Sequence, residues 1–202
     1  MKILKIYENN INDRHIAEAV DALRAGHIVI YPTDSVYGLA VDALNKRATE
    51  LLCRIKGLNP EKNLLSIVCA DLSQASDYVR IDNKVFSIIK GYLPGAYTFI
   101  LPASTRLPKI FKNRKTVGLR VPDNNIARRL AEELGNPLLT TSVDVDESNP
   151  EASVEPENIA LTYANHAAVV IDSGRGDTVP TTMVDLSDSD NPEVVRQGKA
   201  EF

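Results

Sequence analysis

Two kinds of segment alternate along the chain: short runs of β-branched and aliphatic residues, and longer segments in which apolar residues recur every three or four positions. The first pattern is typical of buried strands and the second of helices that pack on a sheet. Residues 13–25 show the helical spacing. Asn12 or Asp13 is a suitable N-cap for this helix, and Gly26 is placed to end it. Residues 27–31 are typical of a buried strand that runs directly into a Pro-Thr-Asp turn.

The same reasoning predicts the other elements. Further strands are expected at 3–7, 38–41, 64–70, 97–101, 116–121, 138–142, 167–172, 181–186 and 193–196. Further helices are expected at 46–56, 83–92, 124–134 and 156–165. The acidic, loop-rich segment 143–156 is expected to be the most mobile part of the chain. This order favours an α/β (α+β) layer architecture with a mostly shared central sheet.

Length and composition are those of one globular domain. The chain has 202 residues, of which 44% are apolar and 25% are charged, and both values are ordinary for a folded domain. No internal repeat is present, and no linker rich in Pro, Gly or Ser divides the chain. We therefore expect a single domain over residues 1–202.

The sequence contains no signal for export, membrane insertion or metal binding. Its first ten residues hold too short an apolar run for a signal peptide, and no stretch approaches the roughly 20 apolar residues that span a bilayer. We therefore expect a cytoplasmic protein with no membrane partner. Cys53 and Cys69 have no second pair and no His at ligand spacing, which predicts buried, reduced thiols. The histidines lie in or beside apolar segments and are expected to be structural: His15, His27 and His166.

The net charge of −4 is distributed unevenly. Residues 83–122 contain eight Lys or Arg and no acidic residue, whereas residues 143–202 contain thirteen acidic and three basic residues, a local net charge of −10. One face is therefore expected to be basic. The basic segment is either a solvated loop of lysines or a surface that attracts a polyanion such as a nucleotide or RNA. The candidate nucleic-acid patch consists of Arg106, Lys109, Lys112, Arg114 and Lys115.

Polar strand ends are the candidates for a ligand site. The chain has no GxxxxGK[ST] loop, no GxSxG elbow, and no third glycine after Gly174-x-Gly176 to complete a dinucleotide fingerprint. Hydroxyl groups and carboxylates instead follow predicted strands at 31–39, 138–144 and 179–183. Open α/β sheets present ligand-binding groups at such places. Each segment alone is typical of a hydrogen-bonded turn, but the three together favour one ligand site.

Six blocks of the sequence carry a family resemblance. They are YPTDSVYGLAVDA at 31–43, the Lys56-Gly57 step, LPGAYTFILPA at 93–103, TVGLRVPDN at 116–124, PLLTTSVD at 137–144, and TTMVDLS followed by VVRQG at 181–198. In this order they resemble the YrdC/YciO family over nearly the whole chain. The resemblance implies a twisted, mixed central α/β sheet flanked by helices, with a large basic cavity. In synthase members this cavity binds ATP and L-threonine, which react with bicarbonate to give threonylcarbamoyl-AMP and pyrophosphate, for the modification of adenosine 37 in tRNA.

The resemblance also implies roles for individual residues. Thr33 and Tyr37 would border the threonine pocket, and Arg120 would pair with the amino acid's carboxylate, because a guanidinium can contact two oxygens at once. Phosphates of ATP would be met by Lys56 and Arg196, with hydroxyl groups from Ser142 and Thr182. ATP would be a substrate accompanied by Mg²⁺. The chain would need no protein-bound cofactor, no metal site of its own and no side-chain nucleophile, because positioning and charge neutralisation suffice for adenylyl transfer.

The chain departs from the synthase pattern at two positions. Synthases typically carry Lys-x-Arg where this chain has Lys56-Gly57-Leu58, and Ser-x-Asn where it has Ser142-Val143-Asp144. Asp144 then places a carboxylate at the expected phosphate site, which is unfavourable unless a metal or a base compensates. Both changes resemble the YciO branch. Two hypotheses stay open: a threonylcarbamoyl-AMP synthase or a close nucleotidyl-transferring relative, and a YciO-type RNA-binding protein that acts on tRNA, double-stranded RNA or ribosomes.

Overall fold

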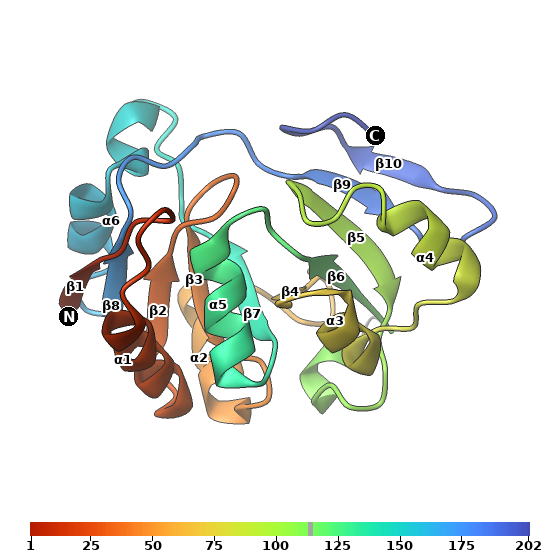
Figure 1. The fold of residues 1–202 in the computed structure, drawn as a ribbon, viewed down its shortest axis with the longest axis horizontal. Coiled ribbons are helices and arrows are strands. Elements are labelled where there is room, and N and C mark those ends of the chain that lie inside the picture. The colour runs from red at the N-terminus through yellow and green to blue at the C-terminus, as the bar shows by residue number, and fades with distance from the viewer. Residues whose placement is uncertain (113–114) are drawn as a thin grey trace.

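A computed structural model of the chain describes residues 1–112 and 115–202. In this part of the chain ten strands form one sheet, in the order β1-β8-β2-β3-β7-β4-β6-β5-β9-β10 (Figure 1). The strands are β1 (Lys2–Lys5), β2 (Ile28–Tyr31), β3 (Gly38–Asp42), β4 (Ser66–Val68), β5 (Tyr97–Pro102), β6 (Thr116–Arg120), β7 (Leu138–Ser142), β8 (Ala167–Asp172), β9 (Thr182–Asp185) and β10 (Glu193–Arg196). The helices are α1 (Asp13–Arg24), α2 (Lys46–Ile55), α3 (Leu72–Tyr78), α4 (Asn83–Ile89), α5 (Asn125–Leu134) and α6 (Pro156–Thr162).

The sheet is mixed, as the family resemblance implies. Strands β1, β8 and β2 run parallel to one another, and β3 and β7 follow as antiparallel neighbours. Beyond β7 the sheet continues through β4 and β6 to β5, β9 and β10, so strands distant in sequence lie side by side. Strands β1 and β10 form its two edges, and the chain termini lie at opposite ends of the molecule (Figure 1).

Alternation along the strands divides the core between the two faces of the sheet. In β2, Val29 and Tyr31 pack with α1 and α5 on one face, whereas Ile28 and Ile30 pack with α2 and α6 on the other. Figure 1 shows α1 and α5 together on the near face and α2 behind the sheet. Burial on both faces explains why this strand is apolar at every position.

Helix starts follow the capping residues of the sequence. The side chain of Asn12 accepts a hydrogen bond from the amide of His15 at 3.2 Å, which confirms it as the N-cap of α1. Such a cap satisfies an amide that has no partner within the helix. Helices α2, α3, α4 and α5 are capped in the same way by Asn45, Asp71, Asp82 and Asn124.

The structure differs from the predicted elements in a few places. Helix α3 was not predicted, because its seven residues span too few turns for a periodic pattern to emerge. Strand β4 is shorter than the predicted 64–70, since it pairs with β6 and β7 only from Ser66 to Val68. Within the acidic segment 143–156, residues Pro150–Val154 form a short 3₁₀ helix.

The cysteines are buried, as the sequence analysis expects. Cys53 and Cys69 are buried and free, and burial raises the pKa of the Cys69 thiol, so both thiols are expected to stay protonated and unreactive. Across residues 1–112 and 115–202, no helix combines the length and the apolar character needed to cross a membrane.

Candidate functional site

A cationic cavity of about 150 Å³ lies against one face of the sheet, where β4, β5, β6, β7 and β9 are neighbours. Two arginines and a group of hydroxyl side chains form its polar wall: Arg120, Arg196, Ser66, Thr98, Thr140, Thr141, Ser142 and Thr181. Its apolar wall consists of Leu58, Leu64, Leu65 and Met183. The cavity therefore combines positive charge with many hydrogen-bonding groups.

Strand alternation decides which side chains reach this cavity. In β6, Val117 and Leu119 belong to the hydrophobic core, whereas Arg120 faces the cavity. Gly118 shares the face of Arg120. A Cβ at Gly118 would lie 2.5 Å from Ser66 Oγ, so only glycine leaves room for that hydroxyl group.

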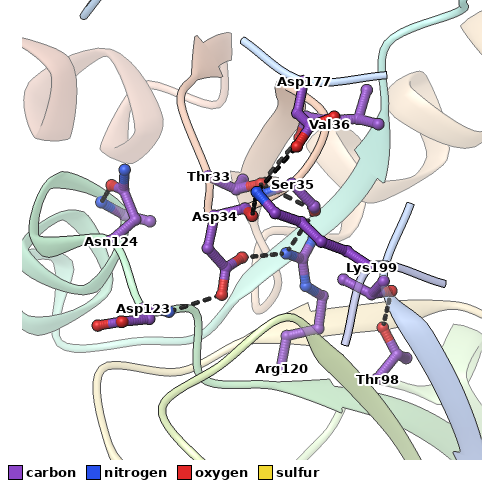
Figure 2. A network of polar contacts seen from close by, with 12 residues as sticks. Thr33, Asp34, Ser35, Val36, Thr98, Arg120, Asp123, Asn124, Asp177 and Lys199 are labelled. Atoms are coloured by element: carbon purple, nitrogen blue, oxygen red, sulfur yellow. Dashed lines mark hydrogen bonds and ion pairs between the residues drawn. The ribbon is translucent and has the colours of Figure 1, made fainter. Parts of the chain in front are cut away.

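Arg120 is anchored by the turn that follows β2. The arginine is only 6% exposed, and its Nη2 donates to Asp34 Oδ1 at 3.0 Å and to Ser35 Oγ at 3.2 Å (Figure 2). Asp34 Oδ2 accepts from the amide of Asp123 at 2.7 Å. The Nε of Arg120 is buried and has no partner among the described residues. An unsatisfied buried donor is costly, so this N–H group would gain stability from a hydrogen-bond acceptor.

Arg196 reaches the same cavity from the end of β10. Its Nε and Nη2 donate to the carbonyl oxygen of Thr181 at 3.2 and 2.9 Å, and Thr181 Oγ1 lies 2.8 Å from Thr98 Oγ1. Burial, and after it the positive charge of Arg120, lower the pKa of Arg196 below its ordinary value. Two guanidinium groups thus repel one another in a small space. An anion bound between them would relieve that repulsion.

Hydroxyl groups on and around β7 complete the wall. Tyr31 Oη and Thr140 Oγ1 share a hydrogen bond of 2.7 Å, and burial raises the pKa of Tyr31, so the pair stays neutral. Gly38 lies against this ring, because a Cβ there would be 2.7 Å from Tyr31 Cε1. Ser142, the last residue of β7, lines the cavity.

Beside the cavity, Lys56 forms a cluster with Asp144 and Tyr163. Lys56 Nζ makes an ion pair with Asp144 Oδ1 and lies 3.4 Å from Tyr163 Oη. Tyr163 Oη donates to Asp144 Oδ2 at 2.8 Å and accepts from the Asp144 amide at 3.0 Å. Burial raises the pKa of Asp144, but the hydrogen bonds from Lys56 and Tyr163 outweigh it, and the pKa lies below its ordinary value. Lys56 therefore already has an anionic partner within the protein.

The structure brings together three of the residues that the sequence singled out: Arg120, Ser142 and Arg196. Two others use their hydroxyl groups within the protein. Thr33 Oγ1 donates to the carbonyl oxygen of Val36 at 2.8 Å, in the turn after β2. Tyr37 Oη donates to the carbonyl oxygen of Gly174 at 2.8 Å, and burial raises the pKa of Tyr37 to about 12. Both residues shape the segment that carries Asp34.

Thr182 faces away from the cavity. Its hydroxyl group accepts from the amide of Gly198 at 2.9 Å and donates to the carbonyl oxygen of Ala200. Side chains alternate along an extended chain, so its neighbours Thr181 and Met183 face the cavity instead. Register decides which of two adjacent threonines points into the cavity, and the structure puts Thr181 there rather than Thr182, the residue that the resemblance implied.

The candidate nucleic-acid patch is only partly described. Arg114 and the side chain of Lys112 lie outside the described residues. Arg106 forms an ion pair with Asp77 at 2.9 Å. Lys109 and Lys115 line two different surface hollows. The three described cations of the patch therefore have different surroundings.

Sequence reasoning missed three residues of the site. Asp34 and Thr181 stand in the polar strand ends already considered, so strand alternation and charge complementarity with Arg120 were signals that could have found them. Tyr163 follows Asp144 by 19 residues and stands at the end of a predicted helix. No local pattern marks it as the partner of Asp144 and Lys56.

Known proteins match this chain over most of its length. The model of the Sua5_yciO_yrdC family, described as "Telomere recombination", matches residues 21–198. The chain is 40% identical to the uncharacterized protein YciO of Escherichia coli (strain K12) over 195 residues, which cover 96% of this chain and 93% of YciO. It is 32% identical to the threonylcarbamoyl-AMP synthase of Bacillus subtilis (strain 168) over 195 residues, which cover 95% of this chain and 55% of the synthase.

Solved structures show the same relationship. The crystal structure of E. coli YciO matches with a TM-score of 0.90 at 38% identity, over 100% of this chain and 98% of YciO. The crystal structure of P. abyssi Sua5 complexed with L-threonine matches with a TM-score of 0.85 at 27% identity, over 98% of this chain and 58% of Sua5. The twisted, mixed sheet implied by the resemblance is thereby confirmed. By sequence and by fold, the chain belongs to the Sua5/YciO/YrdC family.

Proposed function

We propose that the protein is a nucleotidyltransferase of the threonylcarbamoyl-AMP synthase type. In this reaction the amino nitrogen of L-threonine bonds to the carbon of bicarbonate, and water leaves. A carboxylate oxygen of the resulting carbamate then bonds to the α-phosphorus of ATP, and the bond to the leaving pyrophosphate breaks. The product would supply the threonylcarbamoyl group for tRNA modification in the cytoplasm.

One observation carries this proposal: Arg120, whose buried Nε has no partner among the described residues, lines the same cavity as Arg196. A carboxylate that accepts from this Nε–H would satisfy it. Two relatives support the choice of ligand, since P. abyssi Sua5 is complexed with L-threonine and the B. subtilis relative is a threonylcarbamoyl-AMP synthase.

The proposal gives each side chain of the site a role. Arg120 pairs with the threonine carboxylate, while the turn shaped by Thr33 and Tyr37 borders the amino acid. Arg196 contacts the nucleotide phosphates, and Ser142 donates its hydroxyl group. The cavity of about 150 Å³ is smaller than the roughly 300 Å³ of small ligand pockets. ATP would therefore extend beyond it, toward Lys56.

Catalysis of this kind needs positioning and positive charge rather than a side-chain nucleophile. In this proposal the Arg196 guanidinium group supplies charge where the phosphates react, and that of Arg120 positions the threonine carboxylate. Among residues 1–112 and 115–202, no group of three or more His, Cys, Asp or Glu side chains is arranged to hold a metal ion. In this proposal Mg²⁺ accordingly enters with ATP, bound to its phosphates.

The two departures from the synthase pattern both lie at the ATP end of the site. Leu58 lines the cavity where synthases typically carry an arginine. The carboxylate of Asp144 forms an ion pair with the ammonium group of Lys56. A phosphate must displace this carboxylate before it can contact the lysine. We therefore expect weak binding of ATP and slow turnover.

Pyrophosphate release tests the proposal directly. Purified protein is incubated with ATP, L-threonine and bicarbonate, and each substrate is left out in turn. We expect pyrophosphate only when all three are present. Release that does not depend on threonine, or no release above a protein-free control, would contradict the synthase function.

A second candidate function is the binding of a nucleotide or RNA, including tRNA, double-stranded RNA or ribosomal RNA, with weak or no synthase activity. The ion pair between Lys56 and Asp144 favours it, because it weakens the triphosphate end of the site. Lys109 and Lys115 line surface hollows and could contact a nucleic-acid backbone. These cations lie outside the cavity, so the two candidate functions involve different side chains.

A further inference from the structure

Lys199 connects two distant parts of the molecule. Its Nζ donates to the carbonyl oxygen of Asp34 at 2.8 Å and forms an ion pair with Asp177 Oδ2 at 2.8 Å (Figure 2). The hydrogen bond from Lys199 is also the main reason why the pKa of Asp177 lies below its ordinary value. Lys199 follows β10 at one edge of the sheet, whereas Asp34 follows β2 in the opposite half. The side chain therefore joins the two halves.

The backbone that carries Lys199 is held tightly in place. The amide of Lys199 donates to the carbonyl oxygen of Pro180 at 2.9 Å, and the amide of Gly198 donates to Thr182 Oγ1 at 2.9 Å. A Cβ on Gly198 would lie 2.3 Å from the carbonyl oxygen of Pro180, so the two segments touch without room for a side chain. Lys199 thus extends from a fixed point. The same segment carries Arg196 into the cavity.

The turn that Lys199 contacts is the turn that anchors Arg120. The carboxylate of Asp34 accepts from Arg120 on one oxygen and from the amide of Asp123 on the other. The side chains of Arg120 and Asp34 are only 8% and 10% exposed. A buried ion pair of this kind is favourable only when its geometry is kept. The segment 196–199 therefore carries Arg196 into the cavity, and through Lys199 it contacts Asp34, which anchors Arg120.

We propose that Lys199 is a positioning residue for Arg120. By fixing the backbone of Asp34, it keeps the Asp34 carboxylate against the guanidinium group and leaves the Nε–H of Arg120 directed at the amino-acid carboxylate. We call the hydrogen bond from Lys199 Nζ to the carbonyl oxygen of Asp34 the tether. The consequence for threonine binding rests on the proposed function, whereas the tether itself does not. Loss of the tether weakens the binding of L-threonine. Binding of ATP, which depends on Arg196, is little affected.

Three variants distinguish the positioning effect of Lys199 on Asp34 from the effect of its positive charge. Lys199→Met removes both the tether and one positive charge. Lys199→Met combined with Asp177→Asn also removes the tether but restores the net charge of the unmodified protein. Asp177→Asn alone keeps the hydrogen bond from Lys199 to the Asp34 carbonyl oxygen. A positioning role predicts defects in both Met variants, while a purely electrostatic role predicts recovery in the double variant.

The first measurement needs no ligand. The amide of Asp123 donates to the Asp34 carboxylate, so its hydrogen exchange, followed by NMR, reports how firmly that carboxylate is held. We expect exchange about fivefold faster in both Met variants, the factor that corresponds to the loss of one typical hydrogen bond. Asp177→Asn is expected to leave the exchange of the Asp123 amide unchanged. The amide of Val170 in β8 is the control, and its exchange should be the same in every variant. Unchanged exchange at Asp123 in Lys199→Met would overturn the proposal.

The second measurement is a calorimetric titration with L-threonine and, separately, with ATP. We expect both Met variants to bind threonine about fivefold more weakly, again the factor for one hydrogen bond, with the affinity for ATP unchanged. Recovery of threonine binding in the double variant would mean that Lys199 acts only through its charge, and would refute positioning. If the unmodified protein binds no threonine, the proposed function fails, and the exchange of Asp123 still decides the role of Lys199.

Discussion

The ammonium group of Lys56 lies beneath the carboxylate of Asp144, since the lysine side chain is 8% exposed and the aspartate side chain is 74% exposed. Tyr163 holds this carboxylate in place through its own hydroxyl group. The cation that the family resemblance assigns to the triphosphate of ATP is therefore already paired. A phosphate that approaches from solvent meets the negative charge of Asp144 first.

Removing this charge should improve ATP binding. We expect Asp144→Asn combined with Leu58→Arg to lower the Kd for ATP about tenfold, because Lys56 and the new guanidinium group would each gain a charge-assisted hydrogen bond to phosphate. Calorimetric titration measures the change. Asp146→Asn is the matched control, since Asp146 stands in the same acidic segment but its carboxylate contacts Ser148. A double variant that binds ATP no better than this control would show that neither side chain faces the phosphates.

The same ion pair should make stability depend on pH in the acid range. The folded-state pKa of Asp144 lies below its ordinary value of 3.8, so the contact stabilises the fold above that value and is lost as the pH falls through the lower, folded-state pKa. At pH 7 we expect Asp144→Asn to cost less than about 1 kcal/mol, because the carboxylate is largely exposed. Urea unfolding across the acid range measures the difference between the two proteins, which should shrink as the pH falls below 3.8 and vanish below the folded-state pKa of Asp144. A difference that stays constant with pH would contradict this assignment.

The buried pair of Arg120 and Asp34 should matter far more for stability. We expect Arg120→Met to lower the free energy of unfolding by about 3 kcal/mol, because it leaves a buried carboxylate without its cation, and Arg120→Met with Asp34→Asn to cost less. Arg106→Met is the control, since its ion pair with Asp77 is largely exposed and should contribute less than about 1 kcal/mol. Denaturant unfolding compares the three variants. Equal costs for Arg120→Met and Arg106→Met would disprove the special role of the buried pair.

RNA binding, if it is the second function, should depend on the basic patch and on salt. We expect neutralisation of Lys112, Arg114 and Lys115 to glutamine to weaken binding of double-stranded RNA and to reduce the slope of log affinity against log salt by roughly 3, since each of the three lost phosphate contacts removes about 0.9 unit. Filter binding at several salt concentrations measures both quantities. The control neutralises Lys2 and Lys5 on the edge strand β1. Equal effects of the two changes would exclude the patch as the binding surface.

Most of the secondary structure was predictable from local pattern alone. The runs that became β2, β5, β6 and β8 are short and apolar, and the helical spacing and caps of α1 and α5 identify those helices. The failures concern short elements, such as α3, where few residues carry the signal. The resemblance pointed to Arg120, Ser142 and Arg196, which line one cavity, because the family motifs place polar and charged residues at strand ends.

The sequence by itself determined the alternation of strands and helices, since periodicity and capping are local properties that can be read along the chain. Through the family resemblance, the order of its motifs also implied the mixed sheet and the chemical character expected of the site. Only the tertiary structure decided which side chains become ion-pair and hydrogen-bond partners. Lys56 and Asp144 are 88 residues apart, and Lys199 and Asp34 are 165 apart. Which cation meets which carboxylate, and which threonine of an adjacent pair faces the cavity, depends on strand order and register. Those are set by how the whole sheet packs, and no local pattern records them.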